Sequence, residues 1–198
     1  DKCVSKTKYK HIETCNKKYG INIILSKHEL NNVKVIPLGK GLVGNVSRHA
    51  ISCNAMIQNK LFQIIGCHLD VYDETEQSRC DQMKTILSNV NLTNIIILGD
   101  LNALRRDDYT DAQWDKIKLI DENRQVTSQT KLTEFLELNE FIDSFKLSKM
   151  NPPTISTWSD RRVDYVYIGL RSQITKTKSH IFQTLSSDHY PIYVDISK

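Results

Sequence analysis

The stretch TNIIILGDLNA, residues 93–103, runs four apolar residues directly into an acid and an amide two positions apart. A continuous apolar run is typical of a strand that is covered on both faces, and Gly99 allows the backbone to turn as that strand ends. Asp100 and Asn102 are then predicted to lie on one side, because side chains alternate along an extended chain. A carboxylate can bind a divalent cation or accept a proton from water, and an amide can donate to developing negative charge. Taken alone, such an acid is more often a capping residue in a turn.

Three further polar groups lie at the ends of other apolar runs. His68 follows a strand-like run in IIGCHLD, and Asp164 interrupts the apolar stretch RRVDYVYI, where a buried acid needs a partner such as a histidine. Asp188 and His189 precede a third apolar run in SSDHYPIYV, and such a pair can bind a metal ion and a phosphate together. Each match alone is more often structural. Four of them in one fixed order indicate a single active site.

Composition places these residues in an ordinary globular chain of 198 residues, with 39% hydrophobic and 25% charged residues. We find no repeat or linker, which favours one domain over residues 1–198. The net charge of +4 permits a phosphate-bearing substrate but falls short of a strongly basic DNA-coating surface. No apolar run is long enough to span a membrane. The five cysteines are an odd number without C-x-x-C spacing, and Cys53 and Cys67 lie within apolar runs like core residues, which favours a reducing, intracellular location in cytoplasm or nucleus.

The elements that position the polar groups follow from short apolar runs rich in Ile and Val. These runs predict strands at Ile21–Leu25, Val33–Leu38, Ala50–Ile57, Leu61–His68, Asn94–Leu98, Val163–Ile168 and Tyr190–Ile196. One helix is predicted between residues 68 and 94, with Asp73 as its cap and Glu76 three positions later. A second is predicted at Lys131–Leu138, and the polar stretch 104–130 is predicted to run over the surface beside the Asp100 strand end.

Taken in order, GCHLD, GDLNA, RRVDYVYI and SSDHYPIYV resemble the endonuclease/exonuclease/phosphatase superfamily, the DNase I-like metal-dependent phosphoesterases, from about residue 19 to the C-terminus. The resemblance implies an α/β (α+β) fold, a four-layered sandwich of two packed mixed sheets flanked by helices. It implies that Asp100 and Asn102 orient or activate water. It also implies that His189 and His68 contact phosphate, and that Asp164 orients His189.

The metal and substrate contacts are predicted beside these residues. The resemblance implies Asp188 as a metal ligand, with Asp100 as the second carboxylate for Mg²⁺ or Mn²⁺. Arg105 follows the Asp100 strand end and Arg162 precedes Asp164, so we predict that both bind substrate, with solvated surface charge as the alternative. An Arg-x-x-Gln feature of the family, at residues 79 and 82, is predicted to serve packing.

One departure from the family pattern concerns the N-terminal part. The family begins with a strand ending in Asn and a second strand carrying Gln-Glu, whose Glu binds the metal ion, and neither is found before Tyr19. Glu13 and Glu29 do not follow a Gln. The fold is therefore expected to be incomplete at its N-terminus and to bind Mg²⁺ weakly as given.

The function that these residues predict is a divalent-metal-dependent phosphoesterase that hydrolyses phosphodiester bonds with water as nucleophile. Nucleic acid is favoured as the substrate over a lipid or inositol phosphate, and no obligate protein partner is predicted. A catalytically degenerate binding module is the alternative from another class, because the metal-binding Glu is not found.

Overall fold

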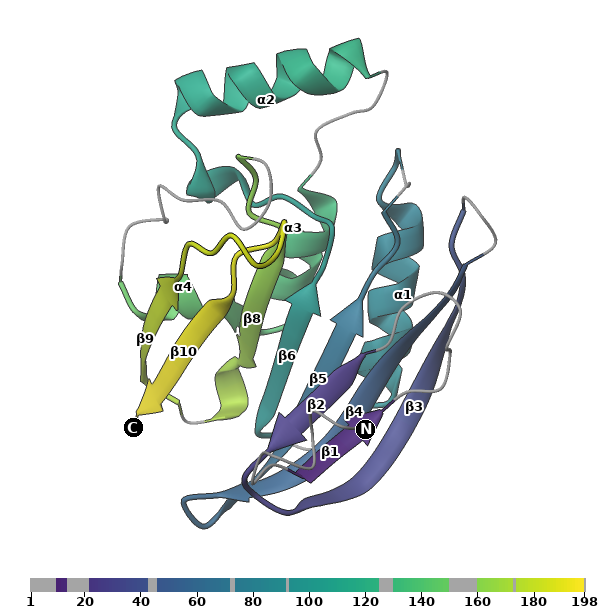
Figure 1. Cartoon of the computed structure of the whole chain (residues 1–198), viewed down its shortest axis with the longest axis vertical. Coiled ribbons are helices and arrows are strands. Elements are labelled where there is room, and N and C mark those ends of the chain that lie inside the picture. The colour runs from purple at the N-terminus through teal and green to yellow at the C-terminus, as the bar shows by residue number, and fades with distance from the viewer. Residues whose placement is uncertain are drawn as a thin grey trace.

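A six-stranded mixed sheet forms the centre of the chain (Figure 1), with the strand order β3-β4-β5-β6-β8-β7. The computed structural model describes residues 10–13, 22–42, 46–71, 74–91, 93–124, 130–149, 160–172 and 174–197. The strands of the central sheet are β3 (Leu30–Lys40), β4 (Ser47–Ile57), β5 (Lys60–His68), β6 (Ile95–Asp100), β7 (Phe141–Asp143) and β8 (Asp164–Gly169). Among the strands of this sheet, only β5 and β6 are parallel neighbours. The last residues of β5 and β6 and the first residues of β8 therefore lie side by side at the same end of the strands.

Two antiparallel strand pairs lie on one face of this sheet, α1 and α3 lie on the other, and α2 lies beyond the ends of the strands (Figure 1). The pairs are β1 (Lys10–Glu13) with β2 (Ile23–Ser26), and β9 (Lys176–Ile181) with β10 (Ile192–Ser197). The space beside Gly66 in β5 is filled by Ile24 of β2, which fixes β2 over the central sheet. The helices are α1 (Gln77–Ser88), α2 (Asp111–Asn123), α3 (Lys131–Leu138) and α4 (Ser144–Leu147), with 3₁₀ turns at Arg106–Asp108 and Leu170–Ser172.

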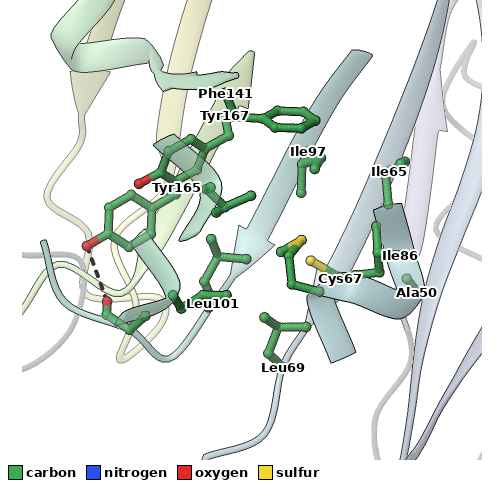
Figure 2. Packing of buried hydrophobic residues seen from close by; sticks show 14 of the residues in the cluster. Ala50, Ile65, Cys67, Leu69, Ile86, Ile97, Leu101, Phe141, Tyr165 and Tyr167 are labelled. Carbon is green, nitrogen blue, oxygen red and sulfur yellow. Dashed lines mark hydrogen bonds between the residues drawn. The ribbon is translucent and has the colours of Figure 1, made fainter. Parts of the chain in front are cut away.

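The main core lies between the central sheet and the two helices α1 and α3. Alternate residues of β5, β6 and β8 face these helices, because period-two alternation sends every second side chain to the same side. Figure 2 shows Ile65, Cys67, Ile97, Tyr165 and Tyr167 of the sheet in this cluster with Ile86 of α1. The buried Tyr165 hydroxyl donates a hydrogen bond to the carbonyl oxygen of Ala103 at 3.2 Å, so the polar end of this ring is satisfied inside the core.

The structure confirms the predicted fold class, and each predicted strand forms with small shifts at its ends in the described residues. The predicted second sheet is present as two separate pairs. β1, β7 and β9 were not predicted, and neither were α2 and α4. The predicted helix at Lys131–Leu138 is confirmed. No helix in the described part of the chain combines the length and apolarity that a membrane span needs.

Two local predictions differ from the structure. α1 begins after Glu76, which is the N-cap residue in a left-handed conformation and makes no side-chain cap, while Asp73 lies outside the described residues. The stretch 104–130, expected as an irregular surface segment, contains α2. Thr110 and Gln113 form a reciprocal capping box at the start of α2, and Trp114 and Ile117 bury its inner side.

Candidate active site

Strand register brings three of the predicted residues into one row across the strand ends of the central sheet. His68, the last residue of β5, pairs in register with Asp100, the last residue of β6. Asp100 in turn pairs with Asp164, the first residue of β8. Directly paired residues on neighbouring strands project to the same face, so the imidazole and the two carboxylates lie side by side. The Nε2 atom of His68 is 3.5 Å from the Oδ2 atom of Asp100.

His189 joins this row from the segment that connects β9 to β10. Its Nδ1 atom is 2.8 Å from the Oδ2 atom of Asp164, which confirms the predicted contact between these two residues. One ligand atom each from Asp100, Asp164 and His189 can be chosen so that all three lie within 4.8 Å of one another. Residues distant in sequence therefore converge on a cluster of two carboxylates and an imidazole.

The turn after β6 fixes Asp100 and Asn102 together, as the sequence predicts. Gly99 has φ +135°, and a Cβ atom there would lie 1.9 Å from the carbonyl oxygen of Cys67, so only glycine fits. Asn102 is also left-handed, with φ +48°, and its backbone N–H donates to Oδ1 of Asp100 at 2.9 Å. Its side-chain Nδ2 donates to the carbonyl oxygen of Leu69 at 3.2 Å. The amide is thereby anchored to the end of β5, close to His68.

Burial and like charge make Asp100 the most perturbed acid of the cluster. Burial, followed by the negative charge of Asp164, raises the pKa of Asp100 to about 6. Part of this rise is opposed by the hydrogen bond from Asn102 and by the positive charges of His189 and Arg48. A carboxylate with its pKa near neutrality is suited to accepting a proton from water.

The two histidines are shifted in opposite directions. Burial, and then the positive charge of Arg48, lower the pKa of His68 to about 4, so this imidazole is neutral at pH 7. Burial alone would lower the pKa of His189, but its hydrogen bond to Asp164 and the charges of Asp164, Asp100 and Asp188 outweigh burial and raise it. The site thus pairs a histidine that is neutral at pH 7 with one whose pKa is raised.

Three of the predicted site residues are placed elsewhere. Asp188 is exposed and is not a member of the cluster; its carboxylate accepts a 3.5 Å hydrogen bond from Ser187. The prediction that Arg105 and Arg162 bind substrate is corrected by their burial, at 7% and 2% exposure. Each guanidinium is occupied by carboxylates, so neither is presented to a substrate.

The Arg-x-x-Gln feature holds the segment that follows His68. Gln82 accepts a hydrogen bond from the backbone N–H of Asp70 at 2.9 Å, and Arg79 donates to the carbonyl oxygens of Asp70 and Val71 at 3.4 Å. The Asp70 side chain accepts from Leu42 and Ser78. The predicted packing role is confirmed, and it fixes the chain immediately after a site residue.

Two features of the site were missed by sequence reasoning. Arg48 in β4 influences both His68 and Asp100, but a single arginine near the start of a strand carries no recognisable signal. A cavity of about 510 Å³ lies beside Asp164 and His189, with largely apolar walls that include Leu98 and Val166. Its walls come from segments that only the fold brings together.

Comparisons with known proteins find the same fold. No protein-family model matches the chain, and no curated protein matches it. An endonuclease/exonuclease/phosphatase family protein from Leptotrichia buccalis C-1013-b superposes with a TM-score of 0.68 at 16% identity, over 98% of this chain and 72% of that one. The human Nocturnin catalytic domain with bound sulfate gives 0.66 at 16% identity, over 99% and 74%. D. rerio TDP2 complexed with a single-strand DNA product gives 0.61 at 15% identity, over 96% and 77%. The chain therefore has the DNase I-like fold of the endonuclease/exonuclease/phosphatase superfamily.

Proposed function

We propose that this protein is a divalent-metal-dependent phosphoesterase that hydrolyses phosphodiester bonds, with nucleic acid as the favoured substrate. The observation that carries the proposal is the convergence of Asp100, Asp164 and His189 at one sheet edge, with His189 hydrogen-bonded to Asp164 at 2.8 Å. Asn102 is fixed beside Asp100 by a turn that requires glycine at the preceding bend. A structural role alone does not call for two partly buried acids in adjacent register.

The residues present fit a divalent cation. One oxygen atom each of Asp100 and Asp164 lie within 4.8 Å of each other and of a ring nitrogen of His189, and hard oxygen ligands suit Mg²⁺ or Mn²⁺. Burial, and then the negative charge of Asp164, raise the pKa of Asp100, and a cation between the two acids would offset that charge. Asp100 and Asp164 would hold the ion, in place of the predicted pair of Asp100 and Asp188. A bound ion would polarise the phosphate oxygens and offset their charge.

The side chains of the chain itself would carry out the remaining work. Asp100 would accept a proton from the attacking water, and the amide of Asn102 would hold that water in line. Asp164 would fix the ring of His189 so that its Nε2–H points to a phosphate oxygen, where negative charge develops. His68, neutral at pH 7, would donate a hydrogen bond to a second phosphate oxygen.

Nucleic acid is favoured among phosphodiesters by two observations. The net charge of +4 attracts a polyanion. One structural neighbour, D. rerio TDP2, is complexed with a single-strand DNA product, and another, human Nocturnin, holds a sulfate ion. Recognition of several phosphates predicts binding that weakens steeply with salt, whereas a small phosphate ester predicts a weak salt dependence.

The test measures hydrolysis of bis(p-nitrophenyl) phosphate and of a labelled DNA oligonucleotide with Mg²⁺, with Mn²⁺ and with EDTA. We expect metal-dependent hydrolysis, and a loss of about a hundredfold or more in kcat for Asp164→Asn and Asn102→Ala. Asp195→Asn, an exposed acid on β10, is the matched control and should retain the rate. Hydrolysis unaffected by EDTA, or by the two site variants, would contradict the proposal. Saturable DNA binding without hydrolysis would favour the binding-module alternative.

A further inference from the structure

The outer face of the β9–β10 pair takes no part in the proposed site. Along β9, exposed and buried residues alternate, because successive side chains of a strand point to opposite faces. The buried Thr177 faces the interior, where its hydroxyl donates to the carbonyl oxygen of Ser144 at 2.6 Å. The opposite face of β9 therefore carries the exposed side chains of Lys176, Lys178 and His180.

Three aromatic rings meet on this outer face. Tyr193 of β10 pairs in register with His180 of β9, and directly paired residues project to the same face. The ring of Phe182, one residue beyond the end of β9, lies 6.3 Å from the ring of His180 and 6.3 Å from that of Tyr193, between ring centres. The centres of the His180 and Tyr193 rings are 6.5 Å apart. We call these three residues the aromatic platform.

The aromatic platform is exposed, although large aromatic side chains are mostly buried in a folded chain. Phe182 is 55% exposed and Tyr193 is 51% exposed, and no other Phe, Tyr or Trp side chain in the described part of the chain is exposed. A single exposed apolar residue needs no explanation. Exposed rings that gather in one place are typical of an interaction surface.

The charges around the aromatic platform favour a polyanion as its partner. Lys176 and Lys178 lie on the same face of β9, and neither forms an ion pair with a carboxylate among the described residues. Asp195, which pairs in register with Lys178, is the acid on this face of the pair, so the cations are in excess. An exposed ring offers a flat surface on which a nucleobase can stack, and lysines attract the phosphates that link the bases.

The aromatic platform also adjoins a residue of the proposed site. The backbone N–H of Phe182 donates to the carbonyl oxygen of Pro191 at 3.1 Å and so closes the segment 182–191. This segment carries His189, whose ring contacts Asp164 at 2.8 Å. It lies at the same end of the molecule as the ends of β5 and β6 (Figure 1). A nucleic acid bound to the aromatic platform is therefore held next to the cluster of acids and histidine.

We propose that the aromatic platform binds single-stranded nucleic acid, with bases stacked on its rings and phosphates near Lys176 and Lys178. A single strand fits better than a duplex, because the bases of a duplex are stacked on each other and present only their edges in the grooves. This inference rests on the proposed function, since it assigns a binding surface to the same substrate. Stacking itself requires neither a metal ion nor hydrolysis, so it can be measured apart from catalysis.

The test is the affinity for a fluorescein-labelled oligothymidine, measured by fluorescence anisotropy in EDTA. Tyr193→Thr removes a ring and keeps a β-branched residue that suits a strand. We expect it to weaken binding by about tenfold to a hundredfold, the range for the loss of one stacked base. Phe182→Leu, which keeps an apolar side chain but loses the ring, should weaken binding as well. Ile23→Thr, which replaces a side chain of β2 that is 53% exposed, is the matched control and should bind as the wild type does.

An oligonucleotide of equal length that lacks bases separates stacking from charge. The wild type should bind oligothymidine more tightly than this abasic backbone, and Tyr193→Thr should lose most of that preference. Lys178→Met should weaken the binding of both and reduce the dependence of affinity on salt. A DNA duplex of the same length should bind more weakly than the single strand.

The outcomes separate this inference from the proposed hydrolysis. A wild type that binds no single strand, prefers the duplex, or binds the abasic backbone equally well would overturn it, as would equal affinity in Tyr193→Thr and wild type or an equal loss in Ile23→Thr. If Tyr193→Thr does not fold by circular dichroism, Phe182→Leu decides, and an unchanged affinity there overturns the inference.

Other partners for the aromatic platform would give a different pattern. If Tyr193→Thr abolishes binding to phosphatidylserine vesicles, or self-association in sedimentation, and leaves DNA affinity unchanged, the surface binds a membrane or a second copy and the inference is wrong. A wild type that stacks bases on the aromatic platform but does not cleave bis(p-nitrophenyl) phosphate would refute hydrolysis alone. Metal-dependent cleavage with unchanged DNA affinity in Tyr193→Thr would refute the role of the aromatic platform alone.

Discussion

Asp100 and Asp164 are neighbours in register, so two carboxylates meet where burial already disfavours charge. The pKa of Asp100 in the folded protein, about 6, lies above the value near 4 of an unfolded aspartate. The folded state therefore binds the extra proton between about pH 4 and 6. This contribution to stability is fully present below about pH 4 and is lost as the pH rises through 6. A divalent cation between the acids would replace the proton at higher pH.

The variant Asp100→Asn removes this titration while keeping an oxygen that can accept the Asn102 hydrogen bond. In metal-free buffer we expect its Tm to exceed that of the wild type by several degrees at pH 8 and to match it more closely at pH 4.5. Mg²⁺ should narrow the gap at pH 8 by stabilising the wild type. The charge of Asp100 also raises the pKa of His189, so the variant loses part of the stability that cationic His189 contributes at low pH, which narrows the gap there in the same direction. Differential scanning calorimetry across pH decides, and a gap that does not vary with pH would refute the coupling.

Acids and histidines at strand ends were predictable from the sequence, and the buried environments of Arg105 and Arg162 were not. Asp100 and His68 each follow an apolar run, and the end of such a run predicts the end of its strand. Arg162 lies two residues before Asp164, also next to a strand, but its environment depends on Asp143 and Asp108, which belong to segments distant in the sequence. A side chain's partners are set by tertiary packing, whereas its place along a strand is set locally.

The turn that ends β6 depends on one glycine whose neighbours are backbone atoms. Gly99→Ala would place a methyl group 1.9 Å from the Cys67 carbonyl oxygen at φ +135°, and neither β5 nor β6 can move away without breaking their pairing. We expect a loss of at least about 3 kcal/mol in the free energy of unfolding, measured by urea denaturation. Gly169→Ala in β8 is the control, since its added methyl group would meet only ordinary contacts at 3.6 Å or more. Comparable stability for the two variants would show that the turn can relax.

Element prediction succeeded where periodicity was strong and failed where it was weak. α3 carries Leu132, Phe135 and Leu136 on one side and was predicted with its observed bounds. α2 buries only Trp114 and Ile117 among its apolar residues, so its start is marked by the capping box rather than by an apolar stripe. Short strands such as β7, with three residues, offer too few positions for any alternation to be recognised.

At the scale of the whole molecule, a buried network of charged side chains connects the start of β8, which carries Asp164, to β7 and to the 3₁₀ turn before α2. Arg162, two residues before the start of β8, binds Asp143 at the end of β7 and Asp108 in the 3₁₀ turn before α2. The guanidinium also stacks on the rings of Phe145 and Tyr165, 4.6 and 4.3 Å from their centres. The backbone N–H of Arg162 donates to the Tyr109 hydroxyl at 2.8 Å. These contacts fix the start of β8, and with it Asp164, against the rest of the fold.

Removal of Arg162 should therefore destabilise the whole chain rather than alter the site alone. Arg162→Met leaves Asp143, which is 0% exposed, as a buried charge with its main partner gone, and we expect a loss of about 3–5 kcal/mol in the free energy of unfolding. The double variant Arg162→Met with Asp143→Leu removes both charges and should cost less than the sum of the two single variants by at least about 1 kcal/mol. Lys84→Met, which breaks an exposed pair with Asp81, is the control and should leave stability unchanged. Urea denaturation of the four variants and the wild type supplies the comparison. Additive losses would mean that Arg162 and Asp143 stabilise the fold independently. The charge network would then not be what holds β7 and β8 together.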